Sequence, residues 1–200
     1  TQGYSSAASD VYKRQGLERL TYSIIIVLVA TMFAWIMALL LKLQPQDFVA
    51  LHLGSMMHLV LRLIASFCGV FGFSIMFNSS VYIAATAACI GAVANTLRLE
   101  LVDYTGMPSA AAAFIGALTA GLLASIIKRN HGYPRISLTV PSIVIMVPGL
   151  YLYRAIYNFG IMSLTEAVLW FAAAIMIIVS LPLGLIFARI LTDRTFRYCS

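Results

Sequence analysis

Six apolar stretches constrain the fold more than any other feature of the sequence. Each is close to the roughly 20 residues that an α-helix needs to cross about 30 Å of hydrocarbon. They cover residues 20–41, 56–77, 81–97, 108–127, 136–158 and 164–191. With 62% hydrophobic and only 10% charged residues, the chain has too little polar surface for a soluble globule. The sequence therefore predicts an all-α polytopic membrane protein with six transmembrane helices.

The fifth apolar stretch contains two prolines, Pro141 and Pro148, and the second is followed directly by Gly149. Proline has no backbone N–H, so each one leaves a carbonyl four residues upstream without its helical partner. In hydrocarbon, such carbonyls must be satisfied by protein, water or a ligand. We therefore predict that the fifth helix is broken at Pro141 and at Pro148-Gly149, with a simple proline kink as the alternative.

A break at Pro148 also predicts a binding site. Pro148 suits the start of a second half-helix, whose amides at Gly149, Leu150 and Tyr151 would remain free at its positive end. Secondary transporters use broken helices of this kind to bind anions. Pro148 and Gly149 are therefore candidate substrate-binding residues.

The third apolar stretch carries a stripe of small residues that ends in two polar side chains. Its members recur at intervals of four, three, four and three residues: Ala84, Ala88, Gly91, Asn95 and Arg98. Small residues let helices approach closely in lipid, so this face is expected to point into the protein. Asn95 and Arg98 become candidate substrate-binding residues. The alternative for Arg98 is an interfacial arginine that reaches out to water.

Two more candidates lie on the second half of the broken helix. Arg154 can pair with a carboxylate through two hydrogen bonds, and the hydroxyl of Tyr153 can orient a polar substrate. An aromatic belt with an interfacial cation is the alternative, because Tyr151 and Tyr157 lie near the same boundary. Whether Arg98 or Arg154 would hold a substrate carboxylate stays open.

Enzyme and metal motifs are missing from the sequence. There is no GxSxG, HExxH or P-loop motif, so we expect no catalytic residues, no cofactor and no enzyme. His58 and Arg62 lie four residues apart, but arginine is not a metal ligand, and we expect no metal site. Glu100 and Asp103 are interpreted as part of a solvated turn.

Basic residues predict the orientation in the membrane. Six crossings place both termini on one side, and nine of the 13 lysines and arginines fall on that side, which predicts that it is cytoplasmic. The net charge of +6 thus reflects topology, and we expect no nucleic-acid partner. The cations of the loop 128–135, KRNHGYPR, suit anionic headgroups, so membrane lipid is an expected partner.

The two ends of the chain are expected to lie outside the fold. Residues 1–16 are polar, lack helical periodicity and contain SSAASDVYKRQ, which resembles translated sequencing-adapter peptide. We interpret them as a non-native or disordered tail. Residues 193–200 are expected to form a cytoplasmic tail.

Three motifs in order along the chain resemble those of one family. GFSIMFN occupies residues 72–78, GAVANTLR residues 91–98, and TVPSIVIMVPGLYLYRA follows with the spacing P-x6-P-G-x3-Y. Together they resemble the threonine/serine exporter family, in its smaller carboxyl-terminal membrane domain, over residues 56–191. The chain departs from the family at Asn95, where a histidine is common.

The resemblance implies a domain of about five spans that works with an amino-terminal exporter domain, either fused upstream or supplied as a separate chain. Residues 17–43 would be the last helix of that upstream domain, and residues 54–192 the five-helix exporter domain. It further implies a secondary exporter of threonine, serine or related small carboxylates, driven by the proton motive force. We expect a homo-oligomer in the bacterial inner membrane. The alternative is an assembly or scaffold subunit without its own substrate site.

Overall fold

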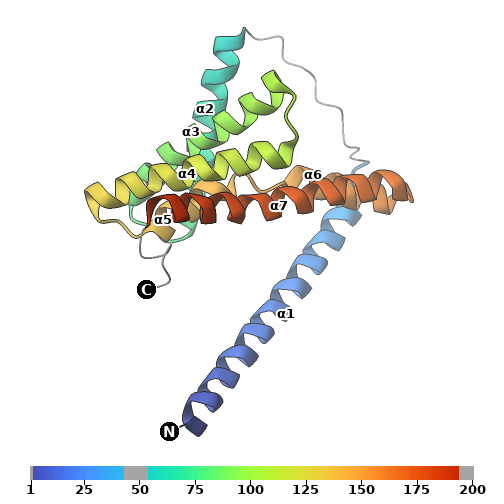
Figure 1. The fold of residues 1–200 in the computed structure, drawn as a ribbon. Coiled ribbons are helices and arrows are strands. Elements are labelled where there is room, and N and C mark those ends of the chain that lie inside the picture. The colour runs from blue at the N-terminus through green and yellow to red at the C-terminus, as the bar shows by residue number, and fades with distance from the viewer. Residues whose placement is uncertain (1, 43–53, 194–200) are drawn as a thin grey trace. The chain divides into compact units, whose positions relative to one another are not determined.

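The computed structural model describes the backbone of residues 2–42 and 54–193, and the side chains of residues 14–42, 54–128 and 132–193. These residues form helices and no strands, which confirms the predicted all-α fold (Figure 1). The helices are α1 (Gln2–Leu40), α2 (Ser55–Met76), α3 (Val81–Thr105), α4 (Ser109–His131), α5 (Arg135–Val144), α6 (Gly149–Gly160) and α7 (Leu164–Thr192).

Most of these helices are long and apolar enough to cross a membrane. Five pass this test alone, and α5 and α6 pass it together as a pair bent by 44°, which makes six spans when the pair is one broken span. The predicted polytopic membrane protein with a broken fifth helix is therefore confirmed. The chain divides into two compact units, of which the first holds α1 and the second α2 to α7.

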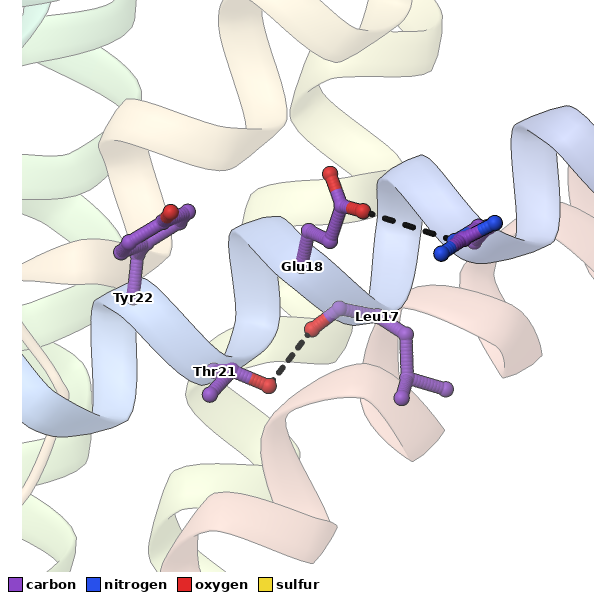
Figure 2. A pocket seen from close by; sticks show the side chains of 5 residues that line it. Leu17, Glu18, Thr21 and Tyr22 are labelled. Carbon is purple, nitrogen blue, oxygen red and sulfur yellow. Dashed lines mark hydrogen bonds and ion pairs between the residues drawn. The ribbon is translucent and has the colours of Figure 1, made fainter.

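The first unit is the single long helix α1, which includes residues 2–16. The backbone there is helical, and the interpretation of residues 1–16 as a non-native or disordered tail stays a prediction. Figure 2 shows a shallow pocket on α1 that is lined by residues of this helix. Its polar contacts join residues four apart, with Thr21 Oγ1 donating to the Leu17 carbonyl at 2.9 Å and Arg14 Nε lying 3.7 Å from Glu18 Oε1. Such contacts are ordinary within a helix, and we assign the pocket no function.

The second unit is organised around α3, which packs against α2, α4 and α5. The stripe of small residues on α3 is buried, which confirms that this face points into the protein. At Gly91, an added Cβ atom would lie 2.6 Å from Val70 of α2 and 3.1 Å from the Cα of Ser142 of α5. The absence of a side chain at Gly91 thus lets three helices meet at one point.

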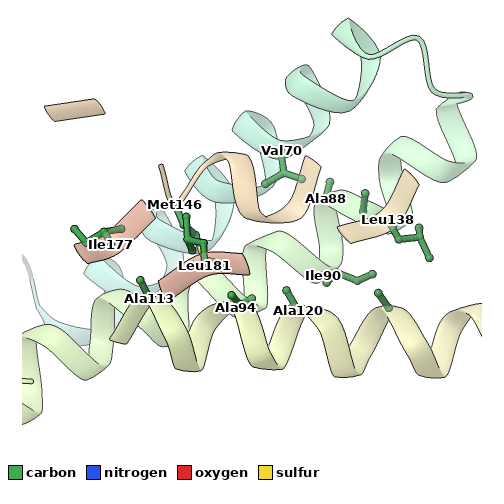
Figure 3. Packing of buried hydrophobic residues seen from close by; sticks show 13 residues of the cluster. Val70, Ala88, Ile90, Ala94, Ala113, Ala120, Leu138, Met146, Ile177 and Leu181 are labelled. Atoms are coloured by element: carbon green, nitrogen blue, oxygen red, sulfur yellow. The ribbon is translucent and has the colours of Figure 1, made fainter. Parts of the chain in front are cut away.

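The strongest helix pairing joins α4 to α7, which run side by side in Figure 1. A Cβ atom on Gly184 of α7 would lie 2.6 Å from the Phe114 carbonyl oxygen and 2.8 Å from the Cβ of Ala117 on α4. The buried core behind this seam is built mainly from alanines, with Met146, Ile177 and Leu181 meeting where the broken helix approaches α7 (Figure 3).

The span formed by α5 and α6 is interrupted at residues 145–148, which we call the helix break. The break lies next to Pro148, as predicted, but the expectation of a break at Pro141 is wrong, since Pro141 lies inside α5. A helix tolerates one missing hydrogen bond where packing holds it, and here Ser142 Oγ lies 2.6 Å from the Leu138 carbonyl and 2.9 Å from the Ala87 carbonyl of α3. Ser142, the residue after Pro141, thus joins α5 to α3 at this point.

Substituting Gly184 with alanine tests the α4–α7 seam. The new methyl group would collide with the backbone of α4 around Phe114, so we expect the Gly184→Ala variant to lose about 1–3 kcal/mol of stability. Gly72→Ala is the matched control, because a Cβ atom there meets nothing within 4 Å. Thermal unfolding in detergent measures both variants, and equal midpoints would contradict the close approach.

Candidate functional site

Arg98 of α3 extends to the helix break. Its Nη1 donates a hydrogen bond of 2.9 Å to the carbonyl of Met146, a residue whose own side chain is fully buried. In a continuous helix, that carbonyl would accept from the amide of Leu150. The guanidinium therefore takes the place of a backbone donor that the break has removed.

Asn95 lies one turn before Arg98 on the same face of α3 and is only 5% exposed. Its Nδ2 donates to Ser66 Oγ of α2 at 2.8 Å. Its Oδ1 is buried and has no hydrogen-bond partner in the described part of the chain, and the same holds for Nε of Arg98. One acceptor and one charged donor are thus left unused within a single turn of helix.

Unsatisfied buried polar atoms are rare, since each costs about 1–3 kcal/mol. Thr96 and Ser74 also carry one, so an unpaired hydroxyl alone does not mark a site. What distinguishes Asn95 and Arg98 is that they lie one turn apart on the same face of α3, and that Arg98 reaches the break in a transmembrane helix. This arrangement is able to accept a small ligand that has both an anionic group and a hydrogen-bond donor.

The first turn of α6 also presents backbone donors at the break. The amides of Leu150 and Tyr151 have no backbone acceptor among the described residues. The expectation of a free amide at Gly149 is wrong, because the chain turns back sharply and this amide donates to the Val147 carbonyl at 2.8 Å. Pro148 is buried and Gly149 is exposed.

The aromatic side chains of α6 divide between two directions. Tyr151 packs against the buried core, which includes Met146 of the helix break, so it lies with the core rather than in an outer belt. Tyr153 is 44% exposed and its ring neighbours that of Tyr157, with centroids 6.5 Å apart. Tyr153 is therefore not brought to Asn95 and Arg98 by any described contact.

Arg154 is engaged with α7. The carbon of its guanidinium lies 4.7 Å from the centre of the Trp170 ring, which also meets the ring of Tyr151 edge to face at 5.5 Å. A cation over an indole face is a favourable contact in itself. The described contacts place Arg98, and not Arg154, at the helix break.

A second polar group, which we call the ion cluster, consists of Arg62, Glu100 and Asp103. Arg62 of α2 pairs with Glu100 through Nη1 and Oε1 at 3.0 Å, and with Asp103 through Nη2. The interpretation of the two acids as a solvated turn is wrong, because α3 continues to Thr105 and carries both. The ion cluster ties α2 to the last two turns of α3, in a pocket that His58 and Tyr104 also line.

Comparison with protein families gives a match to the model described as Threonine/Serine exporter, ThrE, over residues 62–191. The chain belongs to the threonine/serine exporter family. No curated protein and no solved structure matches the chain. The match includes the helix break, Asn95, Arg98 and the ion cluster, so the polar groups described above all lie within the exporter domain.

Family membership makes the chain a threonine/serine exporter-type transporter, a multi-pass membrane protein whose substrate is a small amino acid. Among the side chains that the structure describes, no three His, Cys, Asp or Glu residues are placed to hold a metal ion.

The exporter's ion cluster predicts strong coupling between α2 and α3. Removing Arg62 leaves two carboxylates close together, so Arg62→Gln is expected to destabilise the protein more than the double variant Arg62→Gln/Glu100→Gln does. A double-mutant cycle in detergent should give a coupling energy of about 1–3 kcal/mol.

The pair Arg14 and Glu18 on α1 is the matched control for this cycle. It is 3.7 Å long and joins two side chains that are 86% and 62% exposed, so its coupling is expected to be about 0.5 kcal/mol or less. Additive effects of Arg62→Gln and Glu100→Gln would contradict the ion pair.

Proposed function

We propose that this chain is the carboxyl-terminal membrane domain of a secondary exporter that moves threonine, serine or related small carboxylates out of the cell at the expense of the proton motive force. The observation that supports this most is the Arg98 guanidinium at the helix break, with its Nε unused, in a chain of the threonine/serine exporter family. A buried cation next to unpaired amides suits a carboxylate, the group that all these substrates share.

The proposed site has one position for each end of an amino acid. The substrate carboxylate binds Arg98 and the amides of Leu150 and Tyr151, next to Pro148 and Gly149. Asn95 Oδ1 accepts a hydrogen bond from the ammonium or hydroxyl group of the substrate.

Arg98 is a better counter-charge than Arg154, because Arg154 is already engaged with the Trp170 ring. Its Nε also lacks a partner, so it can bind a carboxylate without first giving up another contact at that atom. Tyr153 and Arg154 remain candidates for a second state of the transport cycle, in which α6 has moved.

Access to this site requires movement, since Asn95 is closed off by Ser66 of α2. Within the second unit, α2 packs mainly against α3 and less against α5. A displacement of α2 away from these two helices is therefore the simplest opening. That movement breaks the bond between Asn95 and Ser66 and separates the ion cluster. We propose that it is one half of an alternating-access cycle.

Within this scheme, Glu100 carries the coupling proton. Its side chain is 19% exposed, the lowest value among the carboxylates that the structure describes, and it shares Arg62 with Asp103. Two carboxylates and one guanidinium leave a net charge of −1, which one proton neutralises. Protonated Glu100 would bind Arg62 more weakly, and α2 would be released from α3.

The remaining parts of the proposal rest on the family and the topology. The amino-terminal exporter domain, fused or separate, completes the transporter, and α1 is its last helix. The protein is a homo-oligomer in the bacterial inner membrane with both termini in the cytoplasm.

Transport by Arg98 variants tests the site. The assay is uptake of labelled threonine, serine and succinate into inverted vesicles that contain this chain and an upstream-domain partner. Arg98→Gln is expected to reduce uptake at least about tenfold, because a charged hydrogen-bond donor to the substrate is lost. Arg19→Gln, at an exposed position of α1, is the control and should retain the uptake, while Arg154→Gln tests the rival counter-charge.

Three outcomes would count against the proposal in different ways. Full uptake by Arg98→Gln removes Arg98 from the site, and loss in Arg154→Gln alone moves the counter-charge to α6. If the wild-type chain transports nothing beside a working positive control, the scaffold subunit becomes the better explanation.

The variant Glu100→Gln tests whether Glu100 couples transport to the proton gradient. This variant should lose accumulation that depends on the proton gradient but keep exchange of labelled for unlabelled threonine across the vesicle membrane. Asp103→Asn, which neutralises the more exposed carboxylate of the cluster, should keep both activities. Accumulation by Glu100→Gln that still follows the gradient would exclude Glu100 as the proton carrier.

A further inference from the structure

A second polar pocket lies where α4 and α7 end and α5 begins. The residues that line it are Ser125, Ile126, Lys128, Arg135, Thr192 and Asp193. We call it the basic pocket. None of these residues belongs to the helix break or to the ion cluster, and the proposed transport cycle makes no use of them.

Arg135 is held in the basic pocket by neutral oxygen atoms. Its Nη2 donates to the Gly121 carbonyl and its Nη1 to Thr192 Oγ1, both at 3.4 Å, which is longer than an ordinary hydrogen bond. The carboxylate of Asp193 interacts with it electrostatically but also lies 3.9 Å from Arg189 Nε. Two cations thus share this one carboxylate, and Arg189 repels Arg135.

Helix dipoles explain two of the three cations near the pocket, but not Arg135. Lys128 and Arg189 lie near the carboxyl ends of α4 and α7, where a positive charge is favourable. Arg135 is the first residue of α5, where the positive end of the helix repels it, and Pro134 before it supplies no capping side chain. An anion bound beside Arg135 would relieve this repulsion and would also suit the amino end of α5.

The remaining wall of the basic pocket consists of hydroxyl groups and of apolar surface. The Oγ atoms of Ser125 and Thr192 lie 3.1 Å apart, so two hydroxyls face the same space as the cations. Beside them Ile126 is 57% exposed, and Ile136, in the first turn of α5, is 75% exposed. The site therefore combines cations and hydroxyls with an open apolar flank, which is the combination that a phospholipid requires.

We propose that the basic pocket binds the phosphate group of an anionic phospholipid, with Lys128 and Arg135 as its cationic contacts. The acyl chains lie against Ile126 and Ile136. Lys128 and Arg135 in the pocket, together with Arg189, carry three positive charges against the one carboxylate of Asp193, so one phosphodiester lowers the net charge of the site from +2 to +1. A bound lipid joins α4, α5 and α7 at the point where the broken span begins.

Lipid retention by the purified full chain tests this proposal. Native mass spectrometry counts the phosphatidylglycerol molecules that stay bound after exchange into detergent, and titration gives their affinity. Wild type is expected to retain one phosphatidylglycerol more than Lys128→Gln/Arg135→Gln does, and the double variant to bind it at least about tenfold more weakly. Arg14→Gln/Arg19→Gln removes two exposed arginines of α1 and serves as the charge-matched control, with retention equal to wild type.

A further variant excludes misfolding as the cause of lost binding, and soluble ligands distinguish the possible sources of the phosphate. Arg135 also bonds to Gly121 and Thr192, so its substitution could disturb the fold. Lys128 is exposed, and the single variant Lys128→Gln keeps those bonds. It should still bind phosphatidylglycerol more weakly than wild type. Equal retention by wild type and both pocket variants would overturn the proposal. The proposal would also be overturned if inorganic phosphate or threonine stabilised the wild type as much as phosphatidylglycerol does. Either result would assign the pocket to a soluble ligand.

Discussion

The second unit of this protein depends on how one interrupted helix satisfies its backbone in a medium without water. Every carbonyl that loses its helical donor in hydrocarbon must find another, or the span is not stable. At the helix break, Val144 accepts from the amide of Val147, and Met146 accepts from the Arg98 guanidinium. The second bond joins α3 to the break, so the same contact that permits the interruption also fixes the position of the polar side chains around it.

The core around the break is made of small residues rather than large ones. In lipid there is no hydrophobic gain in bringing apolar helices together, so contact area has to come from close backbone approach. Gly91 and Gly184 provide it at the two main seams, and the alanines between them leave little space for movement. At Gly91 the close approach includes Val70 of α2, and α2 is joined to α3 in addition by polar contacts, namely the bond between Asn95 and Ser66 and the ion cluster. The α2–α3 interface therefore combines apolar packing with polar contacts, whereas the α4–α7 seam at Gly184 rests on close backbone approach.

Much of this arrangement can be predicted from sequence, because hydropathy, small-residue spacing and proline positions are local signals. The spans, the buried face of α3 and the break at Pro148 follow from them. The ion cluster does not, because Arg62 and Glu100 are 38 residues apart and nothing local marks them as partners. The contact of Arg154 with Trp170 on another helix does not follow from local signals either. The same is true of the Gly149 amide, which donates to the Val147 carbonyl in a turn. Nor do local signals predict the tertiary contact of Ser142, which follows Pro141 in the continuous helix α5 and bonds to the Ala87 carbonyl of α3.

The bond between Arg98 and the Met146 carbonyl has a consequence for how tightly any ligand can be held. The carbonyl is an internal competitor, tethered at a high effective concentration to the cation that a carboxylate would need. Exchange of one oxygen ligand for another releases less free energy than binding to a bare guanidinium would. If Arg98 holds the substrate as proposed, such a site favours rapid turnover over retention. Without substrate, the guanidinium stays bonded to the Met146 carbonyl instead of leaving a bare charge inside the membrane.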